Sequence, residues 1–179
     1  MTIPEYQKLT MRTFKLLNSP FEEVSHMVLG LMSEHNELSE AMTINDDINI
    51  KEEIGDKLWY LSNLANIFNV ELDINFMPKG QNKVLMLLYS DLSNNVKRKY
   101  VYNSGKEDEN IIYIINCIFR ALIDLIVYLF GQDISILEEI MNKNINKLYI
   151  RYPDQYKDDY ALIRNIQEAR KNLGCEYNE

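Results

Sequence analysis

The chain has 179 residues, the size of one ordinary domain, and carries 27 acidic residues against 19 basic residues, a formal charge of −8. So acidic a surface excludes DNA, RNA and anionic membranes as expected partners, because binding to them depends on basic side chains. Six glycines and four prolines are too few for the many turns of a β-sandwich or barrel, so the composition favours an all-α protein. The two cysteines, Cys117 and Cys175, form no disulfide framework, which predicts a reducing, cytoplasmic setting.

Capping signals and the spacing of apolar residues mark the predicted elements in chain order. Thr2 with Glu5 and Ser19 with Glu22 each fit the Ser/Thr-x-x-Glu capping box, so helices should begin near residues 3 and 20. No stretch alternates for long enough to predict a strand. The apolar spacing predicts helices over about 20–42, 51–69, 81–102, 111–130, 135–151 and 158–173.

The segment 111–130 (IIYIINCIFRALIDLIVYLF) is long and apolar enough to be weighed as a membrane span. Arg120 and Asp124 lie near its middle, where each charge would cost roughly 2.5–3.5 kcal/mol at the centre of a bilayer. The segment is therefore expected to be the buried helix of a bundle.

Two parts of the chain are weakly similar to each other in sequence. The segment around Glu34 (LMSEHNELSEAM) matches that around Asp91 (LLYSDLSNNVKR) at an offset of 91 − 34 = 57, and residues 52–61 match residues 120–129 at an offset of 68. The alternative is chance similarity between two amphipathic helix pairs. A true repeat would place two helix pairs with pseudo-two-fold symmetry in a four-helix bundle. It predicts a single domain over 1–179, made of a first half (1–77), a degenerate second half (81–153) and a C-terminal helix (154–179).

Four acidic residues stand out in the first half of the chain. Glu34 and Glu37 are three residues apart, as are Glu53 and Asp56, so each pair projects from one face of its helix. Four converging carboxylates would repel one another unless a cation lay between them, and oxygen ligands suit Mg²⁺ or Mn²⁺. The pattern indicates a metal site, and the alternative is a pair of solvated acidic faces.

A di-iron centre is the other kind of metal site that the sequence could encode. Glu23 and His26 form a Glu-x-x-His pair, the unit from which di-iron bundles are built, but such sites need two of these pairs. The other histidine, His35, is preceded at that spacing by Met32. The second pair is missing, so the sequence disfavours a di-iron centre and predicts that His35 packs inside the protein.

Glu34-x-x-Glu37 followed by Glu53-x-x-Asp56 resembles the metal motif of the MazG-like all-α nucleoside triphosphate pyrophosphohydrolases, a family that includes dimeric dUTPases and dCTPases. The opening EYQKLTMRT is similar to the leader of phage and bacterial members. The segment LEEIMNKNINKLYIRYPD is similar to their closing segment. The matching residues of that closing segment are Asn144, Lys147, Arg151 and Tyr152.

The resemblance implies a Mg²⁺-dependent enzyme, with Mn²⁺ as a substitute, that cleaves a nucleoside triphosphate to the monophosphate and diphosphate. A deoxyribonucleotide is the favoured substrate, and a homodimer is compatible with the family. Glu34, Glu37, Glu53 and Asp56 would be both the metal ligands and the catalytic carboxylates. Such a metal neutralises phosphate oxygens and activates a water molecule.

Two positions depart from the family pattern. Many members carry another glutamate just before the first motif acid, whereas this chain has Ser33, so Glu40 or Glu52 could be the base, or the metal alone could activate the water. Lys57 stands where an apolar residue is usual, and its simplest interpretation is a side chain that faces solvent.

The second half lacks the acids, since Asn94 and Ala121 stand where Glu37 and Glu53 would fall. It has instead a basic run over 96–106 that resembles the family's basic segment; the alternative is a solvated basic face. We expect the second half to supply the residues that bind phosphates, while Tyr60 and Asn63 face the nucleoside. The expected phosphate ligands are Lys97, Lys99, Lys106, Lys147 and Arg151.

The sequence leaves two alternatives to hydrolysis. One is a nucleotide-binding sensor that keeps the pocket but does not turn over, and it is motivated by Ser33 and the degenerate second half. The other is a helical interaction module without a ligand.

Overall fold

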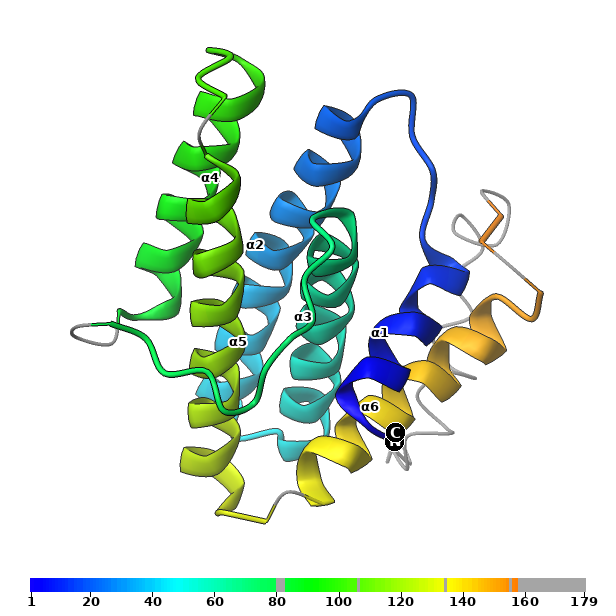
Figure 1. Ribbon diagram of the computed structural model, residues 1–179. Helices are drawn as coiled ribbons and strands as arrows, with labels where there is room; N and C mark the ends of the chain where they lie inside the picture. The colour runs from blue at the N-terminus through cyan, green and yellow to red at the C-terminus, as the bar shows by residue number, and fades with distance from the viewer. Residues whose placement is uncertain (80–82, 106, 134, 155, 158–179) are drawn as a thin grey trace.

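The computed structural model describes residues 1–79, 83–105, 107–133, 135–154 and 156–157, and this part of the chain is helical, without a strand (Figure 1). Its elements are α1 (Ile3–Thr10), the 3₁₀ turn η1 (Met11–Thr13), α2 (Pro20–Ile44), α3 (Asp47–Ile67), α4 (Leu85–Tyr100), α5 (Asp108–Phe130) and α6 (Ser135–Arg151). The prediction of an all-α fold is confirmed. Lys106 and the helix predicted over 158–173 lie outside the described residues.

Side-chain caps begin the first two of these helices. At α1 the Thr2 hydroxyl accepts a hydrogen bond from the Glu5 amide, and the Glu5 carboxylate accepts one from the Thr2 amide, so the predicted capping box is complete. At α2 Ser19 accepts a hydrogen bond from the Glu22 amide, but the Glu22 carboxylate turns to the amide of Asn18. Both helices begin where the caps predict.

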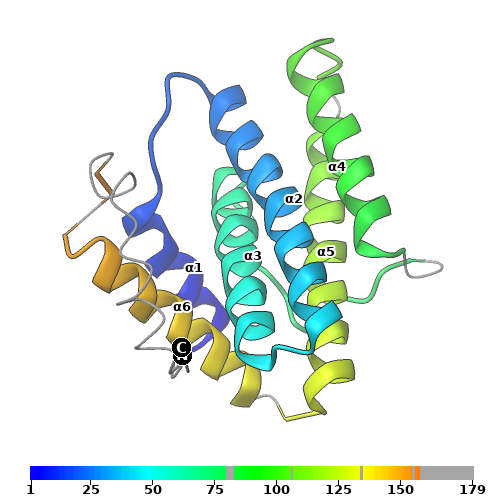
Figure 2. The same cartoon turned by 180° about the vertical axis from the view of Figure 1, so that it is seen from behind.

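The connection between α2 and α3 is shorter than predicted. The Asp46 side chain accepts a hydrogen bond from the Asn49 amide at 3.1 Å and caps α3, which therefore begins at Asp47 rather than near residue 51. Asn45 has the left-handed conformation (φ 55) in which the chain leaves α2. This tight turn makes α2 and α3 antiparallel neighbours (Figures 1 and 2).

Helices α2 to α5 form a four-helix bundle. Helix α4 runs antiparallel to α2, with Tyr100 against Phe21 (ring centroids 5.7 Å apart) and Tyr89 against His35 (5.5 Å). Helix α5 packs on both α3 and α4, while α6 and α1 pack against the other side of α3 (Figures 1 and 2). The two predicted helix pairs are therefore adjacent, and their origin as a sequence repeat stays a prediction.

Helix α5 is long and apolar enough to span a membrane by length and composition, with a mean hydropathy of 2.0 over its most apolar window. However, 56% of that window is buried inside the protein, as in the core helix of a bundle. Arg120 and Asp124 pair with each other at 2.7 Å along one turn of this helix, and both stay partly exposed. The arrangement agrees with the expected role of α5 as a core helix.

Candidate metal centre

Three of the four predicted acids converge between α2 and α3. One carboxylate oxygen from each of Glu34, Glu37 and Glu53 lies within 4.8 Å of the other two. Glu34 and Glu37 meet Glu53 because both lie on the face of α2 that the tight turn brings against α3. The Glu53 side chain is the deepest of the three, at 6% exposure, whereas Glu37 is exposed. The convergence expected from the two motifs therefore occurs for these three residues.

The electrostatics of this carboxylate cluster favour a bound cation. Burial, with added repulsion from neighbouring carboxylates, raises the pKa of Glu53 to about 9 and that of Glu34 to about 7. Within the described residues, the buried Oε2 atom of Glu53 has no hydrogen-bond partner. An all-oxygen donor set with one unsatisfied buried oxygen fits a hard divalent cation such as Mg²⁺ or Mn²⁺.

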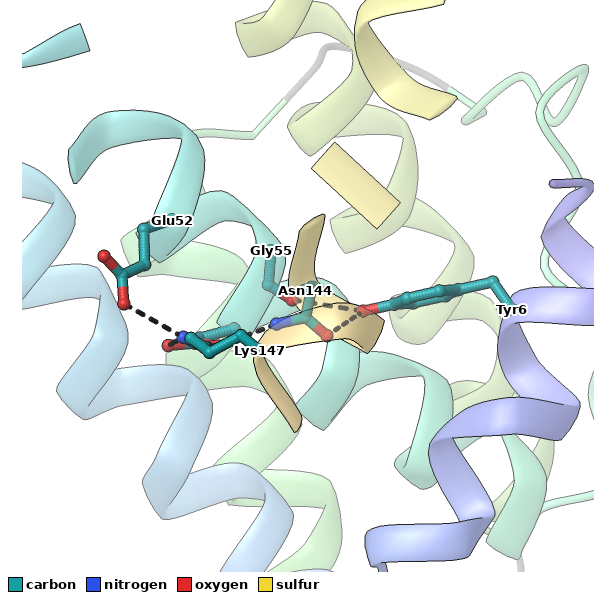
Figure 3. A network of polar contacts seen from close by, with 6 residues as sticks. Tyr6, Glu52, Gly55, Asn144 and Lys147 are labelled. Carbon is teal, nitrogen blue, oxygen red and sulfur yellow. Dashed lines mark hydrogen bonds and ion pairs between the residues drawn. The ribbon is translucent and has the colours of Figure 1, made fainter. Parts of the chain in front are cut away.

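Asp56, the fourth acid, is bound to α6 instead of joining the cluster. Its Oδ1 accepts hydrogen bonds from Asn144 Nδ2 at 2.7 Å and Lys147 Nζ at 2.6 Å, and its Oδ2 lies 2.5 Å from the same ammonium (Figure 3). Lys147 also donates to Glu52 at 3.2 Å. Burial alone would lower the pKa of Lys147, but the charges of Asp56 and Glu52 outweigh it and hold that pKa above its ordinary value. Lys147 is therefore a fixed positive charge beside the carboxylate cluster.

The orientation of Asn144 is set from α1. The buried Tyr6 hydroxyl lies 2.8 Å from Asn144 Oδ1 and 3.2 Å from the carbonyl oxygen of Gly55, and it can donate to either (Figure 3). A donor at Oδ1 turns the amide NH₂ of Asn144 toward Asp56. Tyr6 was not predicted as a site residue, because its partners lie 49 and 138 residues away and no local pattern indicates them.

Tyr60 lies between the carboxylates and the end of α6. Burial raises its pKa to about 12; the charges of Glu34 and Asp56 add to this shift, and Arg151 opposes it. A Cβ at Gly30 would lie 2.1 Å from Tyr60 Cε1, so only glycine at that position of α2 allows the ring to pack there. The Tyr60 ring therefore packs on α2 one turn before Glu34, and its expected contact with the nucleoside stays a prediction.

Arg151 and Tyr152 end α6 near Tyr60. The Arg151 guanidinium lies 5.3 Å from the centre of the Tyr152 ring, and its buried Nε has no partner among the described residues. Arg12 anchors this end of the helix by donating to the carbonyl oxygens of Tyr152, Pro153 and Asp154. The structure thus brings this part of the predicted closing segment to the same side of α3 as Asn144 and Lys147.

Asn63 is fully buried two turns beyond Asp56 in α3. Its Nδ2 donates to the Trp59 carbonyl oxygen at 3.0 Å. Its Oδ1 is buried without a partner in the described part of the chain. The side chain thus has an unused acceptor.

The basic end of α4 does not reach the carboxylate cluster within one chain. Lys97 is exposed, and Lys99 pairs with Asp108 and lies over the Phe68 ring. Tyr100 in the same turn contacts Phe21, whereas Glu34 lies 13 residues further along α2, a rise of about 20 Å. The structure therefore does not bring Lys97 or Lys99 to the carboxylate cluster, whereas Lys147 of α6 contacts Asp56 beside it, and the expected composite site stays a prediction.

Lys57 is buried, so the interpretation that it faces solvent was wrong. Its side chain is 0% exposed, its Nζ donates to the Leu31 carbonyl oxygen at 3.1 Å, and it lies 4.7 Å from the centre of the Tyr89 ring. Burial lowers its pKa to about 7, although Glu34 and Glu53 act in the opposite direction. The signal was present in the sequence, because position 57 lies on the buried stripe of α3.

The histidines lie outside the carboxylate cluster. His35 packs edge-on against Tyr89, as expected of an interior residue, and His26 packs against Tyr60. Burial lowers the pKa of both side chains. The metal-compatible cluster found among the described residues contains carboxylates alone.

The described part of the chain is all-α and contains a cluster of three carboxylates that could hold a metal ion. Residues 22–79 match the family described as MazG nucleotide pyrophosphohydrolase domain, which is consistent with a MazG-like protein and with the resemblance found in the sequence. The match includes α2 and α3 with all four motif acids, and it covers 58 of the 179 residues (79 − 22 + 1). Searches of curated proteins and of solved structures each found no match.

Proposed function

We propose that the protein is a Mg²⁺-dependent nucleoside triphosphate pyrophosphohydrolase that converts a (d)NTP and water to the (d)NMP and diphosphate. The observation that carries this proposal is the convergence of Glu34, Glu37 and Glu53 within the segment that matches the MazG domain. That domain implies nucleotide pyrophosphohydrolase activity. The metal dependence goes further and rests on the carboxylate cluster, whereas the choice of a deoxyribonucleotide rests on the family resemblance.

The metal would be held by Glu34, Glu37 and Glu53, joined by Asp56. When bound, Mg²⁺ or Mn²⁺ neutralises phosphate charge and lowers the pKa of a coordinated water. Asp56 Oδ1 accepts hydrogen bonds from Asn144 and Lys147, whereas Oδ2 accepts one from Lys147 alone, so a lone pair of Oδ2 is left for the metal. The anionic substrate itself offers Lys147 an alternative partner.

The phosphate chain would be bound from α6. Lys147 supplies a positive charge next to Asp56, and Arg151 has a buried Nε donor without a partner in the described residues. Arginine suits phosphate because its guanidinium can donate two parallel hydrogen bonds. Asn144 would position the metal ligands through its bond to Asp56.

The nucleoside would lie near Tyr60. Its ring borders the carboxylate cluster on one side and Arg151 on the other, and Tyr152 lies beside Arg151. Asn63 has an unused buried acceptor that could receive a hydrogen bond from a base or sugar. A deoxyribonucleotide is the proposed substrate, which rests on the family resemblance alone.

Of the two acids that could replace the missing glutamate at position 33, Glu52 is the better supported base. It shares Lys147 with Asp56, whereas Glu40 is exposed on α2. The Ser33 hydroxyl donates to the Gly30 carbonyl oxygen at 3.0 Å and cannot take a proton from water as a carboxylate can.

The remaining parts of the proposal concern the setting of the protein. Lys97 and Lys99 would contact a substrate only if a second copy of the chain brought them to the site, as a homodimer could. Lys106, outside the described residues, is kept as a proposed phosphate ligand on the resemblance of the basic run to the family. A cytoplasmic, nucleotide-pool or house-cleaning role follows from the proposed chemistry. The single-domain organisation over 1–179 stays part of the same proposal.

The experiment that tests the activity is diphosphate release over a panel of NTPs and dNTPs with Mg²⁺ or Mn²⁺. Glu53→Gln should abolish turnover, because it removes the deepest carboxylate of the cluster while keeping its shape. Glu109→Gln, an exposed change on α5, is the matched control and should keep wild-type turnover. Turnover that persists in Glu53→Gln would contradict the proposed metal site.

The second candidate function is a nucleotide sensor without hydrolysis, and Ser33 favours it because the usual acid is missing there. Nucleotide-dependent thermal stabilisation without diphosphate release would support the sensor. If neither stabilisation nor turnover is observed, the helical interaction module is the remaining candidate.

A further inference from the structure

A hollow of about 460 Å³ opens between α4 and α5. This volume lies within the range of small-molecule sites, which is about 300–1,000 Å³. Leu88, Asp91 and Asn95 line it from α4, whereas Tyr89 and Ser93 of the same helix contact α2. The hollow therefore faces away from α2 and is separate from the carboxylate cluster between α2 and α3.

From this hollow we infer a second binding site, one that takes a nucleoside monophosphate by direct contact with basic side chains and without a metal. Four basic residues line the hollow against two acidic ones, a balance of 4 − 2 = +2 in a chain whose net charge is −8. The two negative charges of a phosphate monoester dianion would neutralise this excess of two positive charges. The basic residues are Lys79, Lys83, Arg98 and Arg120, and the acidic residues are Asp91 and Asp124.

The basic side chains are held in place but remain able to change partners. Lys83 pairs with Asp91 at 2.5 Å and is 54% exposed, while Arg98 lies 3.5 Å from Glu107 and is 63% exposed. The Lys83–Asp91 pair is exposed on both sides and contributes little net free energy, so a phosphate group can take over the Lys83 donor. The Arg98–Glu107 contact engages Nε at 3.5 Å, the long end of an ion pair, and the exposed guanidinium can turn to a phosphate. A guanidinium can also bind a phosphate with two parallel hydrogen bonds.

The rest of the hollow suits the nucleoside. Leu88 and Ile114 are buried and provide an apolar floor. Tyr113 stands at the rim, where its ring packs against Phe76 (centroids 5.7 Å apart) and its hydroxyl accepts a hydrogen bond from the Lys79 amide at 2.8 Å. A fixed aromatic ring above an apolar floor can stack a base, as aromatic side chains do in single-strand binding.

The metal-compatible cluster found among the described residues lies between α2 and α3 and not at the hollow. Asp91, Ala121 and Asp124 line it at the positions that the sequence repeat pairs with Glu34, Glu53 and Asp56. Ala121 thus offers no carboxylate where the first helix pair has its deepest one, and Arg120 adds a positive charge next to it. The same face of the second helix pair therefore suits an anion directly rather than through a cation.

The test is calorimetric titration of the full chain with dNMPs and NMPs in EDTA, where the carboxylate cluster holds no metal. We expect saturable binding of a monophosphate that inorganic phosphate or the free nucleoside alone does not reproduce. The double variant Lys83→Gln/Arg98→Gln should weaken it by about tenfold or more, because it removes two charged hydrogen-bond donors. Circular dichroism checks that this variant folds, as its two exposed changes should allow.

Two controls separate this site from the proposed active site. Lys8→Gln removes an exposed charge from α1, away from the hollow and from the carboxylate cluster, and should leave the affinity unchanged. Glu53→Gln should bind the monophosphate in EDTA as the wild type does. The inference is overturned if no monophosphate binds in EDTA, if Lys8→Gln weakens binding as much as the double variant, or if inorganic phosphate binds equally tightly. Binding lost in Glu53→Gln would overturn it too, by assigning the ligand to the α2–α3 site. Failure of the pyrophosphohydrolase assay leaves this measurement untouched, because no turnover is involved.

Discussion

Lys147 on α6 holds the carboxylate of Asp56 on α3 through contacts of 2.6 and 2.5 Å, and these are the closest polar contacts that α6 makes with the metal motif. This pair joins the closing segment of the chain to the segment that matches the MazG domain. The Lys147 ammonium also compensates the negative charge of Asp56 beside Glu34 and Glu53. Burial and charge repulsion already raise the pKa values of these two glutamates.

Removal of the ammonium should destabilise the metal-free protein. Lys147→Met leaves Asp56 and Glu52 without their shared partner, so we expect a loss of about 1–3 kcal/mol in the free energy of unfolding, measured by urea denaturation in EDTA. The KM for the triphosphate should rise about tenfold or more, because the variant also lacks a phosphate ligand. Lys143→Met, which removes an exposed ion pair with Glu139 on the same helix, should change neither quantity appreciably.

The stability of the metal-free protein should depend on pH through the carboxylate cluster. Glu34 and Glu53, with pKa values of about 7 and about 9 against an ordinary 4.5, keep protons in the folded chain that the unfolded chain releases. Stability therefore falls as the pH rises from about 5 to 7. Above pH 7 Glu53 still lowers stability, but Lys57, whose pKa is about 7 instead of 10.5, acts in the opposite direction and flattens the slope.

Thermal melts in EDTA between pH 5 and 8 measure this dependence. Glu53→Gln should show a shallower fall in Tm between pH 5 and 7 than the wild type. Mg²⁺ at pH 8 should raise the Tm of the wild type and not that of the variant. A slope that is identical in both proteins would assign the pH dependence to other groups.

Gly30 is required by the close approach of Tyr60. A Gly→Ala change within a helix ordinarily stabilises a protein by roughly 0.5–1 kcal/mol. Gly30→Ala should reverse that sign and destabilise by about 1–3 kcal/mol, because the new Cβ would lie 2.1 Å from Tyr60 Cε1. Ser39→Ala, at an exposed position of the same helix, is the control, and the two changes in Tm should have opposite signs.

The hydroxyl of Tyr6 should act through Asn144. Tyr6→Phe removes the donor to Asn144 Oδ1 and should lower the free energy of unfolding by about 0.5–1.5 kcal/mol. Because both residues belong to one network with Asp56, the effects of Tyr6→Phe and Asn144→Ala on kcat/KM should be less than additive in a double-mutant cycle. Additive effects would show that Tyr6 does not act through Asn144. Tyr128→Phe, at an exposed position, should change nothing.

Much of the architecture could be predicted because its causes are local. The Thr2–Glu5 box begins α1 through groups three residues apart, and the spacing of Glu34 and Glu37 orients two carboxylates by helix geometry alone. The start of α3 was misjudged because a single side chain, Asp46, caps it within a polar connector that has no apolar periodicity.

The sequence by itself determined the helices, the four motif acids and the resemblance to the MazG-like family, since each depends on local residue patterns. Only the tertiary structure decided that Asp56 binds Lys147 rather than joining the three glutamates and that Lys97 lies far from the cluster. These outcomes depend on which helix faces pack together, and packing joins residues up to 138 positions apart, such as Tyr6 and Asn144. Local spacing carries no information about such contacts, because they are decided by the free energy of the whole bundle.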